Sequence, residues 1–271
     1  MNSRVAGWTS FGALWASILG APIEWLKNTL VFYPNTTVDV SPAEYGLPYE
    51  EVWFGGADGR TLHGWYVPGS GEALFIWFHG NGGNIVHRLD HLRLLYDQVG
   101  GSHLLFDYQG YGRSQGSPTI PGILADGRDA VELVQARGWA TGKRLVYFGE
   151  SLGAAVGIAL AGDLPADRLI LLAPFYSLYA MGRLVLPPLA FLVEAELNSA
   201  RLIQHLRIPL LIIHGTEDEV VPFQQGQDLY AVAQPPKVFR SVPGGGHTNL
   251  HVVGGRAYFT VIRDFVMNPT P

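Results

Sequence analysis

Ser151 stands in a tight glycine frame, the pentapeptide Gly-Glu-Ser-Leu-Gly over residues 149–153. An apolar run over residues 144–148 precedes this frame, and a run of small, helix-forming residues over 154–160 follows it. This order predicts a strand, a sharp turn and a helix, with the serine hydroxyl lifted to the end of a sheet. The glycines leave room for a strained backbone and for close helix–strand packing. A serine hydroxyl is a weak nucleophile, so the turn is useful only beside a base and an oxyanion-binding site.

Asp218 and His247 are the acid and the base that such a serine needs. Each follows a predicted strand, residues 210–214 for the aspartate and residues 237–242 for the histidine. Because the carboxyl ends of parallel strands meet at one edge of a sheet, all three side chains are expected there. The histidine would take the serine proton and return it to the leaving group, and the aspartate would hold the imidazole tautomer.

Three neighbouring residues stay open as alternatives. Glu217 and Glu219 flank Asp218 and carry the same carboxylate group, and His251 follows His247 by one helical turn. Asp218 has the further alternative of capping the next helix. We predict His247 as the base, because the three glycines before it allow a loop to carry the ring to the serine.

The segment over residues 79–84, His-Gly-Asn-Gly-Gly-Asn, follows another predicted strand and is rich in glycine. We predict two backbone N–H groups as oxyanion donors, those of Asn81 and of Leu152, the residue after the serine. His79 is interpreted as a brace for this glycine loop. Asp107 is interpreted in the same way, as the residue that fixes the glycine-rich turn up to Ser114.

Apolar strands alternate with helices along most of the chain. A predicted hairpin, with strands over 51–54 and 62–67 around the turn 57–59, comes first. The alternation after it predicts a mostly parallel, eight-stranded sheet with helices on both faces. The apolar stretch at about 174–209 is longer than a simple crossover, and we predict that it forms a small lid over the strand ends. An ordinary crossover helix with a loop is the alternative. The last helix is expected after Gly255.

The first 33 residues are predicted to be a separate hydrophobic helical segment, and residues 34–271 the main domain. No residue from Val5 to Ile23 is charged. A spanning helix needs roughly 20 apolar residues, so this segment is borderline. It suits membrane association, by spanning the bilayer or by lying in its interface. A helix packed on the surface of a cytoplasmic protein is the alternative.

The composition narrows the class of protein. The chain has 271 residues, of which 48% are hydrophobic, and this is enough for one large domain with a full core. Its net charge of −5 and the lack of basic runs argue against a nucleic-acid partner. It has no cysteine, and its histidines do not show metal-ligand spacing, so no metal site is predicted. No cofactor is required by the chemistry proposed for the serine.

Together, these segments resemble the α/β-hydrolase superfamily over most of the chain from about Phe32. The segments that carry the resemblance are 79–84, 107–114, 149–153, 218–222 and 246–247. They look like those of a subgroup of serine hydrolases that often carries an N-terminal membrane anchor and includes esterases and protein depalmitoylases. The resemblance implies the α/β-hydrolase fold, hydrolysis of an ester or a thioester, and contact with a membrane surface.

We therefore expect a serine hydrolase that cleaves carboxylic esters of a hydrophobic acyl group through an acyl-enzyme at Ser151. A small-molecule ester or another acylated compound is the expected substrate. Two related alternatives are a thioesterase or protein depalmitoylase, and a lipid acyl hydrolase at a membrane surface. A non-catalytic small-molecule receptor on the same fold is an alternative of a different class.

Overall fold

The computed structural model describes residues 23–55, 59–164, 166–193 and 196–268. Within these residues, the apolar runs form one eight-stranded sheet in the order β10-β9-β8-β7-β4-β6-β3-β2. The strands are β2 (Glu50–Gly55), β3 (Thr61–Val67), β4 (Ala73–Phe78), β6 (Ser102–Phe106), β7 (Arg144–Glu150), β8 (Arg168–Leu172), β9 (Leu210–Gly215) and β10 (Lys237–Val242).

Strand β3 runs against both of its neighbours, β2 and β6, whereas the other neighbouring strands pair in parallel. The predicted hairpin is present, with Gly55 opposite Thr61. Residues 57 and 58 of its expected turn lie outside the described residues. The predicted mostly parallel, eight-stranded sheet is therefore confirmed.

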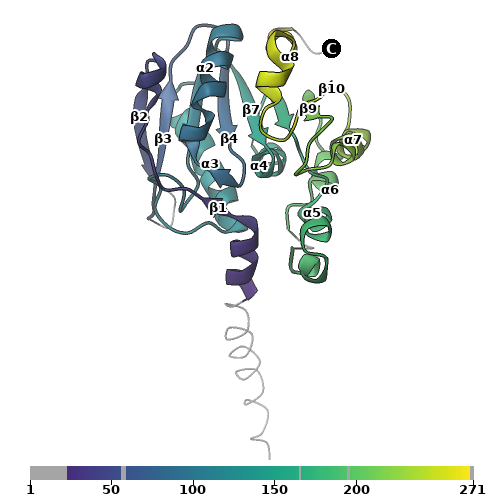
Figure 1. Cartoon of the computed structure of the whole chain (residues 1–271). Helices are drawn as coiled ribbons and strands as arrows, with labels where there is room; N and C mark the ends of the chain where they lie inside the picture. Colours follow the sequence, from purple (N-terminus) through teal and green to yellow (C-terminus); the bar gives the residue numbers. More distant parts are fainter. Residues whose placement is uncertain (1–22, 56–58, 165, 194–195, 269–271) are drawn as a thin grey trace, which may run out of the picture.

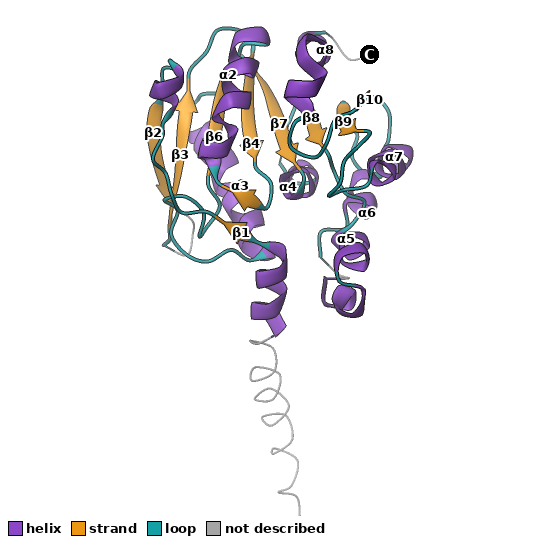
Figure 2. Ribbon diagram, in the orientation of Figure 1, coloured by secondary structure: helices purple, strands orange, loops and turns teal. Residues whose placement is uncertain are grey.

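Helices cover both faces of this sheet (Figure 2). Helices α3, α4, α6 and α7 contribute to the core on one face, and α2 and α8 to the core on the other. Their bounds are α2 (Leu89–Gln98), α3 (Ile120–Ala136), α4 (Leu152–Ala161), α5 (Leu178–Val185), α6 (Ser199–Ile203), α7 (Phe223–Val232) and α8 (Leu250–Met267), with 3₁₀ turns η1 (Pro42–Tyr45), η2 (Ile85–Arg88) and η3 (Pro187–Val193).

Strand β4 shows why both faces must be covered. Its side chains alternate between the two cores, with Ile76 and Phe78 on one face and Phe75 and Trp77 on the other. All four are buried. A strand that is apolar on both sides is stable only between two layers of helices.

Helix α8 begins earlier than the sequence indicated. It starts at Leu250, and Gly255 interrupts it with a non-helical backbone (φ 51°, ψ −140°). Glycine tolerates this left-handed conformation, so two helical pieces follow each other across a kink. The prediction that the helix starts only after Gly255 was wrong, because the first piece, which carries His251, precedes the glycine.

The sheet has a topological switch point between β4 and β7. The chain leaves β4 through α2, on one face, to reach β6, and leaves β7 through α4, on the opposite face, to reach β8. Loops that follow two neighbouring strands of this kind diverge and leave a crevice at the carboxyl edge. The loop of Asn81 follows β4 and the turn of Ser151 follows β7, so both open onto this crevice.

Two further segments lie beyond the carboxyl edge, the helix over residues 23–31 and the α5–η3 segment between β8 and β9 (Figure 1). Lys27 of the first segment contacts Glu196, which follows the second, at 2.8 Å. The α5–η3 segment occupies the stretch that was expected to form a lid. Residues 5–22 of the expected hydrophobic segment lie outside the described residues. Within the described part of the chain, no helix has both the length and the apolar character to cross a membrane.

A short pairing connects the N-terminal part to the loop after β4. Strand β1 (Tyr33–Pro34) pairs in parallel with β5 (Gly82–Gly83). This small two-stranded sheet was not predicted, because two residues are too short for a periodic pattern. It fixes the chain that leaves helix 23–31 beside the loop that carries Asn81.

Three buried histidines make the stability of the fold depend on pH. Burial lowers the pKa of His79 and of His103 to about 3, and it lowers the pKa of His91 well below the ordinary value. The unfolded chain therefore binds protons at these residues near pH 6.5, and the folded chain does not. Their stabilising effect is complete above pH 6.5 and is lost as the pH falls toward the folded-state values.

We predict that the free energy of unfolding falls between pH 6.5 and pH 5. Burial raises the pKa of Asp126 to about 6, so the folded chain gains a proton there over the same interval, and this offsets the effect of about one of the three histidines. Each buried histidine contributes a slope of up to about 1.4 kcal/mol per pH unit. Urea unfolding at a series of pH values measures this slope. A free energy of unfolding that stays constant over this interval would contradict the prediction.

Candidate active site

Ser151 occupies the sharp turn between β7 and α4. Its backbone has φ 52° and ψ −112°, a conformation that costs a non-glycine residue about 1–3 kcal/mol. The turn is held by a hydrogen bond from the Ser151 N–H to the Leu172 carbonyl at 2.9 Å, and by one from the Ala154 N–H to the Ser151 carbonyl at 3.0 Å. The surrounding backbone thus maintains a strained serine at the end of the sheet.

Only glycine fits two residues before and two residues after this serine. A Cβ atom on Gly149 would lie 2.6 Å from the Cα atom of Ala154, and one on Gly153 would lie 1.8 Å from the carbonyl oxygen of Phe78. Both distances are too short for a real contact. Helix α4 therefore packs directly on the ends of β4 and β7, as the glycine frame predicted.

Asp218 lies in the loop after β9, and its carboxylate is fully buried. The N–H groups of Val220 and Val221 donate to its Oδ1 atom at 2.9 and 2.8 Å. The Nδ1 atom of His247 lies 2.9 Å from Oδ2 and 3.1 Å from Oδ1. Because a carboxylate only accepts, Nδ1 carries the proton and Nε2 of the same ring is left as an acceptor.

His214 is a fourth donor to this carboxylate, and sequence reasoning missed it. Its Nε2 atom lies 2.9 Å from the Val221 carbonyl oxygen and 3.2 Å from Oδ2 of Asp218. A Cβ atom on Gly226 would lie 2.2 Å from the other ring nitrogen, so helix α7 can approach the ring only with a glycine there. The one available signal was a histidine at the end of an apolar strand, four residues before the acid.

These contacts determine the charge of Asp218. Burial by itself would raise the pKa of this carboxyl group. The hydrogen bonds from His214 and His247 and the N–H of Val221 act in the opposite direction and hold the pKa well below its usual range. Asp218 is therefore ionised at neutral pH and able to fix the orientation of the His247 ring.

In the described part of the chain, the His247 ring is hydrogen-bonded to Asp218 and not to Ser151. Ser151 and His247 are both buried, and the imidazole shares the wall of a cavity with Leu172, whose carbonyl accepts from the Ser151 N–H. Among the described residues, the serine hydroxyl has no hydrogen-bond partner. Hydrogen bonds between a catalytic base and its nucleophile are often long when substrate is absent, and they shorten when substrate binds. The structure thus brings the acid and the histidine together, and the strand that ends just before Ser151 borders the cavity of His247 through Glu150.

The two expected oxyanion donors belong to separate segments, the loop after β4 and the N-terminus of α4. The Asn81 peptide is fixed through its carbonyl, which accepts from the Tyr33 N–H at 3.0 Å and from the Tyr111 hydroxyl at 2.7 Å. Leu152 is the first residue of α4, where an N–H group has no partner inside the helix. Asn81, Ser151 and Leu152 line one cavity.

His79 and Asp107 brace the surrounding loops. The Nδ1 atom of His79 donates to the Gly80 carbonyl at 2.7 Å, and its Nε2 accepts from the Tyr108 N–H at 3.4 Å. Oδ1 of Asp107 accepts from the Ile85 N–H at 3.0 Å. These contacts agree with the bracing roles predicted for both residues.

The alternative site residues lie elsewhere. Glu217 and Glu219 are exposed, whereas the carboxylate in contact with His247 is that of Asp218. The ring of His251 stacks on that of His91, with centroids 4.3 Å apart. Within the described residues, no group of three or more histidine or acidic side chains is placed to hold a metal ion.

Two cavities meet at this site. The apolar cavity, of about 260 Å³, contains Ser151 and is otherwise lined mainly by side chains of helix 23–31, α5 and η3. The second cavity, of about 650 Å³, contains His247, and we call it the polar cavity because its wall includes Arg88, Glu150 and further histidines. The rest of its wall comes mainly from the β1–β5 pair, α2 and the start of α8. Tyr33 lies in the wall of both.

The contacts of His214 predict a measurable loss of stability on its replacement. His214→Phe keeps a ring of similar size and removes an N–H that donates to a buried carboxylate. We expect the free energy of unfolding at pH 7 to fall by about 1.5–3 kcal/mol, as for a hydrogen bond to a charged group. His205→Phe, at an exposed position, is the matched control and should change it by less than about 0.5 kcal/mol. Equal effects of the two substitutions in urea unfolding would refute this role of His214.

Comparison with known proteins places the chain in a family. Residues 69–202 match the family model described as serine aminopeptidase, S33. An uncharacterized protein of Mycobacterium tuberculosis is 37% identical over 247 residues, which cover 89% of this chain and 87% of that protein. The α/β-hydrolase domain-containing protein WAV2 of Arabidopsis thaliana is 31% identical, over 90% of this chain and 89% of its own length.

A solved structure shows the same fold. The esterase Pf2001 of Pyrococcus furiosus superimposes with a TM-score of 0.74 at 19% identity, over 87% of this chain and 96% of that one. At this identity the likeness concerns the fold alone, with its mostly parallel sheet and helices on both faces. Together with the relatives above, it leads to one conclusion: the chain belongs to the α/β-hydrolase family.

Proposed function

We propose that this protein is a serine hydrolase that cleaves carboxylic esters through an acyl-enzyme at Ser151. Two observations carry the proposal: the buried contact between Asp218 and Nδ1 of His247, and the strained serine at the turn between β7 and α4. Family membership supports hydrolysis in general, and the esterase fold is compatible with it.

In the first step, Oγ of Ser151 attacks the ester carbonyl and its proton passes to Nε2 of His247. The imidazolium that forms is stabilised by the ionised Asp218, and the carbonyl oxygen becomes an oxyanion between the N–H groups of Leu152 and Asn81. The C–O bond to the alcohol then breaks, and the alcohol leaves with the proton from His247. Water, deprotonated by the same imidazole, releases the acid and restores the serine.

The apolar cavity suits the acyl half of the substrate. It is lined by Asn81, Ser151 and Leu152, and its further walls include Leu178, Met181 and Val193. Each methylene buried there contributes about 0.8 kcal/mol, so a hydrophobic acid is favoured over acetate. A thioester of the same acid presents the same carbonyl, and thioesters therefore belong in the substrate panel.

Replacement of the nucleophile tests the proposal. Ser151→Ala should lower ester turnover by about 10⁶-fold while the protein remains folded, because it removes the attacking atom. A fluorophosphonate probe should label the unmodified protein and leave this variant unlabelled, as intact mass spectrometry would show. An unmodified protein that neither takes the probe nor cleaves p-nitrophenyl esters would be a receptor on the same fold.

Replacement of Asp218 tests whether this residue is the acid that orients His247. Asp218→Asn should lower kcat by about 10⁴-fold, because the amide no longer stabilises the imidazolium or holds the correct tautomer. Glu217→Gln and Glu219→Gln are matched controls, since each neutralises an exposed carboxylate that lacks contact with His247. Steady-state kinetics on one p-nitrophenyl ester compare all three variants. A loss of similar size in a control variant would assign the acid elsewhere.

A further inference from the structure

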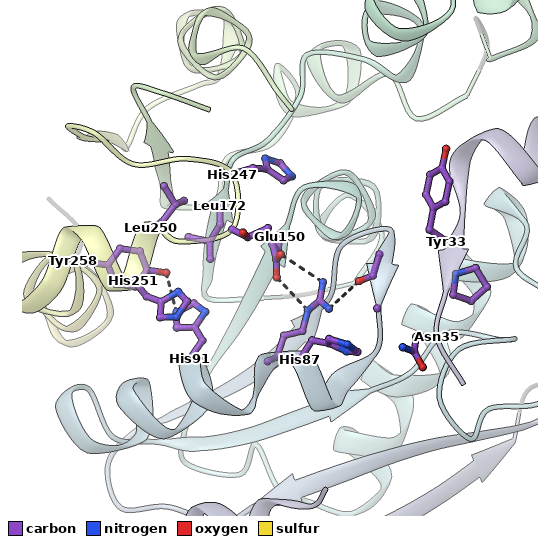
Figure 3. A pocket seen from close by; sticks show the side chains of 15 residues that line it. Tyr33, Asn35, His87, His91, Glu150, Leu172, His247, Leu250, His251 and Tyr258 are labelled. Atoms are coloured by element: carbon purple, nitrogen blue, oxygen red, sulfur yellow. Dashed lines mark hydrogen bonds and ion pairs between the residues drawn. The ribbon is translucent and has the colours of Figure 1, made fainter. Parts of the chain in front are cut away.

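The polar cavity lies on the side of the site from which a leaving group must depart. Figure 3 shows His247 above Glu150 at this cavity, with Tyr33 on one side and His251 on the other. In the proposed reaction, the imidazole that accepts the serine proton also protonates the departing alcohol. The alcohol therefore has to lie within reach of the His247 ring. The apolar cavity already holds the acyl chain, so the polar cavity is left for the alcohol.

The floor of the polar cavity carries a pair of opposite charges. The Nε and Nη2 atoms of Arg88 lie 3.4 and 3.5 Å from the two carboxylate oxygens of Glu150. Arg88 Nη1 also donates to the carbonyls of Gly82 and Asn84, at 2.9 and 3.1 Å. The arginine is thus largely occupied, whereas each oxygen of Glu150 keeps capacity to accept another hydrogen bond. The paired charges favour a neutral ligand over an ion.

Another part of the cavity wall contains histidine rings, whose nitrogens can form hydrogen bonds. His251 stacks face to face on His91, and the Tyr258 hydroxyl lies 3.0 Å from Nε2 of His91. The ring of His251 itself has no hydrogen-bond partner among the described residues, and it faces the cavity (Figure 3). Its nitrogens offer one donor and one acceptor when the ring is neutral. Glu150 and His251 together can therefore bind hydroxyl groups that both donate and accept.

We propose that the polar cavity binds the alcohol half of the ester and selects a neutral alcohol that carries several hydroxyl groups, such as a glycerol or sugar unit. This inference rests on the proposed esterase function and names its substrate class: an ester of an apolar acid with a polyhydroxy alcohol. Hydrolysis then releases the acid from Ser151 and the polyol, which takes its proton from His247.

Two esters of one acid test the inference. Glyceryl monohexanoate and propyl hexanoate share the acyl chain and the three-carbon alcohol skeleton, and they differ by two hydroxyl groups. We expect kcat/KM to be about tenfold or more higher for the glyceryl ester, as for two ordinary hydrogen bonds. Titration of the released acid measures both rates. Equal values of kcat/KM would overturn the inference and leave the esterase function intact.

Three substitutions test which cavity is responsible for the preference for the glyceryl ester. His251→Phe keeps the stack on His91 and removes the ring nitrogens, so the preference for the glyceryl ester should fall at least threefold. His205→Phe makes the same change at an exposed site away from the cavity and should keep the preference. Met181→Trp fills the apolar cavity and should slow both esters without changing their ratio. An unchanged ratio in His251→Phe would overturn the placement of the alcohol in this cavity.

A separate outcome concerns the proposed function itself. If neither ester is cleaved and the fluorophosphonate probe does not label Ser151, the hydrolase proposal fails together with this inference. If the probe labels Ser151 and both esters are cleaved at one rate, only the choice of alcohol fails.

Discussion

The ionised carboxylate of Asp218 is buried away from water. The arrangement of the site depends on the hydrogen-bond donors that stabilise this charge. A buried carboxylate is costly unless donors surround it. Here two backbone N–H groups, His214 and His247 supply them. The same contacts that stabilise the charge fix the loop after β9 and orient the imidazole. The interactions that would maintain the charge for the proposed chemistry are therefore the same ones that hold the folded loop in place.

The sheet explains why such distant residues meet. Ser151, Asp218 and the loop of Asn81 each follow a parallel strand and so reach the same edge, where the switch point between β4 and β7 opens a crevice. Helix 23–31 and the α5–η3 segment form much of the apolar cavity above this edge, while α2 and the start of α8 border the polar cavity. An ester has two chemically different halves, and the site offers two different surroundings on either side of the serine.

Much of this arrangement could be predicted from the sequence. The strands and most helices follow from apolar periodicity, and the glycine frame of Ser151 from the space that α4 needs against Phe78. The contact between Asp218 and His247 agrees with their expected pairing. The lid is a hypothesis about the α5–η3 segment, which lines the apolar cavity.

Other features depend on tertiary contacts that a sequence pattern does not contain. In the sequence, His214 resembles any residue near the end of a strand. Its contact with Asp218 forms only when the loop of Asp218 folds back over it. The β1–β5 pairing is too short for a periodic signal, and the early start of α8 is hidden by Gly255. The polar cavity is built from segments far apart in the chain, so its chemistry emerges only in three dimensions.

In the proposed mechanism, Asp218 orients His247, and His247 acts as the base for Ser151. A crystal structure of the protein with Ser151 phosphonylated by a fluorophosphonate tests it most directly, because the adduct resembles the tetrahedral intermediate. We predict Nε2 of His247 within about 3 Å of Oγ of Ser151 or of the adduct oxygen on the leaving-group side, with Nδ1 still on Asp218. An imidazole that remains out of hydrogen-bond reach of both atoms in the adduct would contradict the account.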